Sequence, residues 1–109
     1  MSSIDLNSTF TLIATITPAP GKKDEVQSAL LSLIDFVQAN EPDVLHYTLH
    51  FHDESSDFVF VEWFKDMEAL DKHGKTDFMR EFKERGEKEA LVVKHDLRIL
   101  KGVVGGFAR

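Results

Sequence analysis

The chain has 109 residues, of which 42% are hydrophobic and 29% charged, with a formal net charge of −6 at pH 7. This length fits a single domain, and an acidic balance with scattered basic residues argues against a nucleic-acid partner. Without cysteine there is no thiol nucleophile, disulfide or thiolate metal site. No apolar run approaches the ~20 residues of a membrane span, and Met1–Thr11 lacks the pattern of a signal peptide. We therefore expect a cytoplasmic protein.

The first part of the chain predicts a strand, a helix and a hairpin. Residues 9–17 alternate apolar and threonine side chains, as in a strand with one buried face. Apolar residues then recur at every third or fourth position over 22–39, which predicts an amphipathic helix, and Pro42 prevents its continuation. Two further strands, 44–52 and 58–64, are separated by a short polar turn and therefore predict an antiparallel hairpin.

The two hairpin strands differ in how apolar they are. In residues 44–52 the side chains alternate, and one face carries Leu45, Tyr47, Leu49 and Phe51. The other face of that strand carries His46, Thr48, His50 and His52. Residues 58–64 are mostly apolar on both faces, which predicts a strand buried on both sides.

The second part predicts two short helices and a last strand. Asp66 is an N-cap for a helix that ends at Gly74, and Thr76 caps a second one with Phe78, Met79 and Phe82 on its apolar side. Residues 91–101 alternate weakly and predict the fourth strand, followed by a glycine-rich tail, 102–109. The order β-α-β-β-α-β predicts an α+β, ferredoxin-like fold with both helical segments on one face of an antiparallel sheet. We expect one domain over 1–109, with its core at about 9–101.

Such a sheet leaves its second face without a cover. Val59, Val61 and Trp63 fall on one face of the third strand, beside either the Leu45 and Tyr47 face or the His and Thr face of another strand. An exposed patch of this kind on a small monomer is an interaction surface. Two sheets can pack face to face around a two-fold axis. The sequence therefore predicts a homodimer.

Three segments resemble the antibiotic biosynthesis monooxygenase family, namely PAPGKKDE at 18–25, EPDVLHY at 41–47 and VEWFKDMEALDKH at 61–73. The most specific part is a strand ending in Glu62 and Phe64, followed by Ala69 and His73. The resemblance covers about residues 9–100 and implies a dimeric α+β barrel. Several members of the family oxygenate quinols, anthrones or related polyphenols without flavin, haem or metal, whereas others have no assigned activity. The resemblance thus implies a small aromatic substrate, O₂ as the second substrate and no cofactor.

The chain also departs from the pattern of that family. Members more often have Trp or Tyr where Phe64 stands, and their Glu-Pro-Gly turn is Glu41-Pro42-Asp43 here. Haem-degrading relatives use an Asn, a Trp and an axial His, whose positions are matched here by Ile13, His73 and Lys83. The resemblance therefore argues against haem degradation.

His73 and Glu62 are the candidate catalytic residues. An imidazole changes charge near neutral pH and can take a proton from a phenol; the alternative is a structural His at a helix C-terminus. Glu62 shares a strand face with Phe58, Phe60 and Phe64, so its pKa is expected to be raised. It either orients His73 or binds a ligand hydroxyl, or else pairs with a Lys or Arg at the end of the sheet.

The candidate substrate-binding residues are aromatic. Tyr47 either donates a hydrogen bond to a substrate oxygen or is a core residue. The phenylalanines either fill the core or line a pocket for a flat ligand, and the candidates for the pocket are Phe60, Phe64, Phe78 and Phe82.

Metal binding is not expected, although His50 and His52 are suitably spaced on one strand face. Three functions remain open. The first is a cofactor-independent monooxygenase of a quinol, anthrone or polyketide-like phenol. The second is a non-catalytic, stress-associated or ligand-binding protein for small aromatic molecules, and the third is an isomerase or lyase of the same fold.

Overall fold

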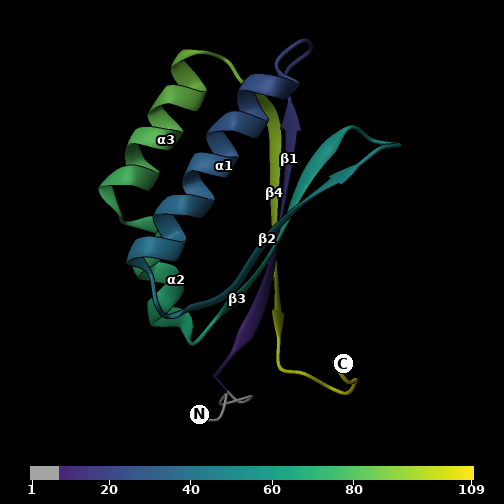
Figure 1. Cartoon of the computed structure of the whole chain (residues 1–109), viewed down its shortest axis with the longest axis vertical. Helices are drawn as coiled ribbons and strands as arrows, with labels where there is room; N and C mark the ends of the chain where they lie inside the picture. The colour runs from purple at the N-terminus through teal and green to yellow at the C-terminus, as the bar shows by residue number, and fades with distance from the viewer. Residues whose placement is uncertain (1–7) are drawn as a thin grey trace.

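The computed structural model describes residues 8–109. The prediction that Met1–Thr11 is no signal peptide concerns a segment that lies mostly outside this range. A four-stranded antiparallel sheet with the strand order β2-β3-β1-β4 carries the helices on one face (Figure 1). The elements are β1 (Phe10–Pro18), α1 (Lys23–Asn40), β2 (Val44–His52), β3 (Asp57–Phe64), α2 (Met67–Gly74), α3 (Asp77–Lys88) and β4 (Val92–Lys101). This confirms the ferredoxin-like α+β fold, with two helices in its second connection. No helix within the described range is long and apolar enough to cross a membrane.

The larger part of the core lies between α1 and the sheet. The predicted apolar stripe of α1 is buried, since Val26, Leu30, Leu33 and Val37 each have an exposed fraction of 3% or less. These side chains pack in one cluster with residues of β1 and β3, among them Phe60. Burial of each such side chain stabilises the fold by about 1.5–3 kcal/mol, so this contact fixes α1 on the sheet.

Two N-caps fix the start of the short helices. The Asp66 carboxylate accepts a hydrogen bond from the backbone N–H of Ala69 (2.9 Å), and the Thr76 hydroxyl accepts one from the N–H of Met79 (3.1 Å). Each cap satisfies an N–H group that has no partner inside its helix. Both helices therefore begin where the sequence predicts, and α2 packs over a second core cluster that includes Phe64.

The alternation predicted for β2, with Leu45 on the same face as Tyr47, is interrupted at Leu45. Val44 lies opposite Phe64 and His46 lies opposite Trp63, so Leu45 is an extra residue without a partner on β3. Such a bulge breaks the alternation of side chains along a strand. As a result Val44 packs against the core, whereas Leu45 is 42% exposed.

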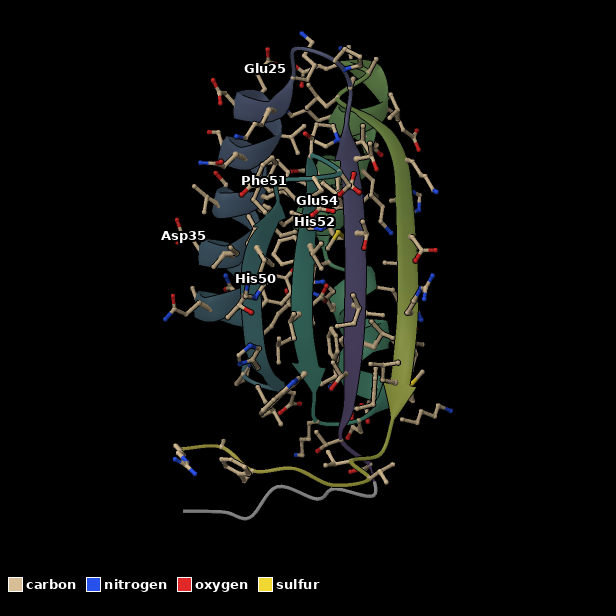
Figure 2. All side chains as sticks on the ribbon, turned by 90° about the vertical axis from the view of Figure 1, so that its right-hand side faces the viewer. Glu25, Asp35, His50, Phe51, His52 and Glu54 are labelled. Carbon is tan, nitrogen blue, oxygen red and sulfur yellow. The ribbon has the colours of Figure 1, made fainter. Side chains whose placement is uncertain are left out.

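The second face of the sheet is not covered by any helix within residues 8–109, as Figure 2 shows by looking onto it. Trp63 is 38% exposed on this face and stacks on the ring of His46, with 4.8 Å between the ring centroids. Ile13 and Val61 lie side by side in the register of β1 and β3. The face is thus apolar at its centre.

Candidate active site

Five of the predicted site residues meet where α2 crosses the helix-covered face of the sheet. Tyr47 on β2 lies directly opposite Glu62 on β3, and Phe60 and Phe64 lie two positions to either side of Glu62. His73, in the last turn of α2, places its ring 5.6 Å from that of Tyr47 and 5.6 Å from that of Phe64, between ring centroids. Tyr47 in turn packs on Phe60 at 4.7 Å. A carboxyl group and an imidazole are therefore buried together beside aromatic rings, two of which contact the imidazole.

His73 is held by a carboxylate that the sequence did not single out. Its Nδ1 lies within hydrogen-bond distance of Oε1 of Glu41 (2.7 Å), and the two side chains are only 7% and 10% exposed. The backbone carbonyl of His73 is already bonded by the hydroxyl of Thr76 (3.2 Å). The imidazole thus bonds to a carboxylate, not to the terminal carbonyls of its own helix.

Glu62 is a buried carboxyl group without a cationic partner from Lys or Arg within residues 8–109. Burial of its side chain, and secondly the negative charge of Glu41, raises the pKa of Glu62 to about 8. Its Oε1 lies 3.9 Å from Nε2 of His73 and makes no hydrogen bond among the described residues. At neutral pH the carboxyl group is therefore mostly protonated and can act as a hydrogen-bond donor.

Tyr47 is also held in its protonated form. Burial, followed by the negative charges of Glu62 and Glu41, raises the pKa of Tyr47 well above its ordinary value. Its hydroxyl therefore remains a donor throughout the neutral range.

Phe78 and Phe82 have no ring contact with His73 among the described residues. Both are on α3, where they pack against the larger core cluster, and Phe78 stacks on Phe36 of α1 at 4.5 Å. The ring contacts of His73 within residues 8–109 are with Tyr47 and Phe64. Of the aromatic candidates, Tyr47 and Phe64 therefore contact the ring of His73, Phe60 contacts Tyr47, and Phe78 and Phe82 belong to α3.

Two surface hollows lie outside the site. One, of about 360 Å³, is bordered by polar and charged residues of α3 and by Gly74. The other, of about 400 Å³, is on the uncovered sheet face between β1 and β4. Neither is lined by the residues that surround His73.

The histidines of β2 are engaged with neighbouring hydroxyl groups. Nε2 of His50 is 2.9 Å from Oγ1 of Thr48, and Nδ1 of His52 is 2.7 Å from Oγ of Ser55. Over residues 8–109 no three His, Cys, Asp or Glu side chains are grouped in a way that could hold a metal ion.

Comparisons with known proteins agree on one family. The sequence model of the antibiotic biosynthesis monooxygenase family matches residues 9–85, a span that includes Glu41, Glu62 and His73. The structure is similar to PA3566 from Pseudomonas aeruginosa (29% identity, TM-score 0.80, 94% of this chain and 100% of that one). It is also similar to SO0527 from Shewanella oneidensis (26%, TM-score 0.77, 85% and 89%). A third similar structure is a Caulobacter crescentus protein provisionally described as an antibiotic biosynthesis monooxygenase (26%, TM-score 0.78, 90% and 92%). No curated protein sequence matches the chain significantly.

Proposed function

Because the chain belongs to the antibiotic biosynthesis monooxygenase family, we propose that it is a cofactor-independent monooxygenase that oxidises a quinol, an anthrone or a polyketide-like phenol with O₂. The observation that carries this proposal is the buried pair of His73 and Glu62, whose Nε2 and Oε1 atoms lie 3.9 Å apart. Buried beside aromatic rings, the pair combines a proton acceptor with a proton donor. These two groups can deprotonate a hydroxylated ring by general acid–base catalysis.

The spacing of the two groups suits one hydroxyl oxygen of the substrate. An oxygen about 2.8 Å from both Nε2 and Oε1 would make a hydrogen bond to each. Its own O–H would donate to Nε2 of His73, while the protonated carboxyl of Glu62 would donate to its lone pair. His73 then takes the proton as general base, and Glu62 stabilises the negative charge that develops on the oxygen.

Oxygenation follows from the electron-rich anion. An anthrone reaches this anion through its enol tautomer, in which one hydrogen of the CH₂ group has moved to the ring oxygen, and His73 takes that proton. For an anthrone, the ring CH₂ group and O₂ become a C=O group and water, so the substrate supplies all four electrons. One oxygen atom forms the new C–O bond and the O–O bond breaks. The second oxygen leaves as water with the two hydrogens of the original CH₂ group, one of them returned through His73. The reaction balances without a further reductant, and the protein contributes orientation and a site shielded from water.

The rings around His73 support an aromatic substrate. In the proposal Tyr47, Phe60 and Phe64 contact the substrate, and the Tyr47 hydroxyl donates to a second oxygen on it. Phe78 and Phe82 are left out of this contact surface, because neither has a ring contact with His73 within residues 8–109 and Phe78 stacks on Phe36.

The proposal includes a homodimer that pairs the uncovered sheet faces. Ile13, Val61 and the 38% exposed Trp63 lie near the centre of that face. A two-fold pairing would bury the same patch on both subunits, and the helix-covered side with His73 would stay on the outside of the interface.

His73→Gln tests the proposed base. We expect the rate of oxygen uptake with a hydroquinone or anthrone to fall about 10²- to 10⁴-fold, as is usual when a general base is lost. The matched control is His95→Gln on β4, where the side chain is exposed, and it is expected to retain the wild-type rate. Equal rates for wild type and His73→Gln would remove His73 from the mechanism.

A thermal-shift measurement on the same ligands separates catalysis from binding alone. A ligand at about a hundredfold excess over its Kd stabilises the folded protein by about 2.7 kcal/mol. Stabilisation without oxygen uptake or product would support the binding-protein alternative.

A further inference from the structure

We propose that Glu41 is the positioning residue of this site, and that its carboxylate holds His73 in the tautomer whose Nε2 is free to accept the substrate proton. The inference rests on the proposed function, and it adds a residue from a different part of the chain to the proposed catalytic pair. Glu41 does not touch the reacting atoms and acts through His73.

The contact between His73 and Glu41 is short and buried, and no other described group bonds to the Glu41 carboxylate. Nδ1 of His73 and Oε1 of Glu41 are 2.7 Å apart, a distance typical of a charge-assisted hydrogen bond. The second oxygen of Glu41, Oε2, is buried and has no hydrogen-bond partner within residues 8–109. No other described group therefore draws the carboxylate away from the imidazole.

The backbone of Glu41 is fixed on both sides. Its N–H donates to the carbonyl of Val37 (2.9 Å) at the end of α1, and its own carbonyl accepts from the N–H of Val44 (3.1 Å) at the start of β2. The loop is tied to β3 as well, since the carbonyl of Asp43 accepts from the N–H of Lys65 (2.9 Å). The carboxylate thus sits on a rigid corner that joins a helix to two strands, and a fixed partner gives His73 a fixed ring orientation.

The position of the proton on the ring decides what His73 can do. A neutral imidazole carries one N–H and one lone pair, and a carboxylate at Nδ1 keeps the proton there. The lone pair is then on Nε2, the atom that faces Glu62 at 3.9 Å. When Nε2 takes a proton, the ring becomes cationic next to the Glu41 carboxylate, which favours that state.

The tautomer of His73 is measurable without any substrate. Long-range ¹H–¹⁵N correlation spectra of ring-labelled protein show which ring nitrogen carries the proton, and His73→Gln identifies the His73 signals. We expect Nδ1–H in the wild type. Glu41→Met fills the same space without a strong acceptor, so the signals should shift to the Nε2–H form. In Glu41→Gln the amide oxygen still accepts, so Nδ1–H should be retained. A Glu41→Met protein that keeps Nδ1–H would overturn the proposal.

Steady-state oxygen uptake tests whether the tautomer of His73 affects the rate of the reaction. For Glu41→Met we expect kcat to fall about 100-fold, the usual scale for a misplaced catalytic group, with KM changed by less than about threefold. Glu41→Gln should recover part of kcat, and Asp35→Asn, an exposed carboxylate on α1 (Figure 2), should match the wild type. Wild-type kcat in Glu41→Met despite a changed tautomer would refute the positioning role. A wild-type protein that takes up no oxygen would refute the proposed function instead, while the tautomer would still test Glu41.

Discussion

Replacing Glu62 by Gln is expected to remove a pH dependence of folding stability. Burial, together with the nearby charge of Glu41, raises the pKa of Glu62 from 4.5 to about 8 in the folded protein. Between these two values the folded state binds a proton that the unfolded chain releases. The stability that depends on this proton is therefore complete below the unfolded pKa and is lost as the pH rises through the folded pKa.

The size of the effect follows from the two pKa values. Each unit of difference between folded and unfolded pKa corresponds to about 1.4 kcal/mol. Raising the pKa of Glu62 from 4.5 to about 8 thus links about 5 kcal/mol of unfolding free energy to its protonation. This is a large part of the roughly 5–15 kcal/mol that stabilises a typical domain. Glutamine has the shape of the protonated side chain and does not titrate.

Urea unfolding from about pH 5 to about pH 9 measures the effect, with Trp63 fluorescence as the probe and the protein concentration held fixed. The unfolding free energy of the wild type relative to Glu62→Gln should fall by about 1.4 kcal/mol per pH unit up to about pH 8. Glu54→Gln, in the exposed β2–β3 turn (Figure 2), is the matched control and should follow the wild type. If the difference in unfolding free energy between wild type and Glu62→Gln stays constant across this range, folding does not raise the pKa of Glu62 and the prediction is wrong.

Three further substitutions test the Tyr47 hydroxyl, the Asp66 cap and the uncovered face of the sheet. Tyr47→Phe keeps the ring but removes the donor, so kcat/KM should fall about tenfold with little change in unfolding free energy; an unchanged kcat/KM would remove the hydroxyl from the site. Asp66→Ala removes the N-cap bond to Ala69, and urea unfolding should show a loss of about 1 kcal/mol; no loss would mean that water replaces the cap. Val61→Lys places a charge on the uncovered face and should yield monomers in sedimentation analysis, whereas a wild-type monomer at micromolar concentration would contradict the dimer.

The elements of the fold were predictable because their signals are local. The buried stripe of α1 repeats at helical spacing, so Leu30 and Leu33 could be assigned to the core from periodicity alone. Asp66 and Thr76 act on N–H groups three residues away, a distance that sequence inspection covers. The placement of Glu62 among phenylalanines also followed from strand alternation.

The errors and omissions concern contacts between distant segments. Leu45 was grouped on one strand face with Tyr47 because alternation was carried through a bulge, and a bulge is set by pairing with β3. Glu41 was noticed only as part of a turn, since nothing local connects it to a histidine 32 positions later. Phe78 is of a residue type that often lines pockets, but the packing of α3 against α1 stacks its ring on Phe36. The only sequence signal for Glu41 was its place in a segment that resembles the family.

The most direct test of the proposed function is to supply ¹⁸O₂ and an anthrone to the purified, metal-free and flavin-free protein. The ¹⁸O content of the product is then measured by mass spectrometry. We expect one ¹⁸O atom per product molecule, formed above the autoxidation blank and lost in His73→Gln. A product without ¹⁸O, or no product beyond the blank over a broad panel of anthrones and hydroquinones, would contradict a monooxygenase.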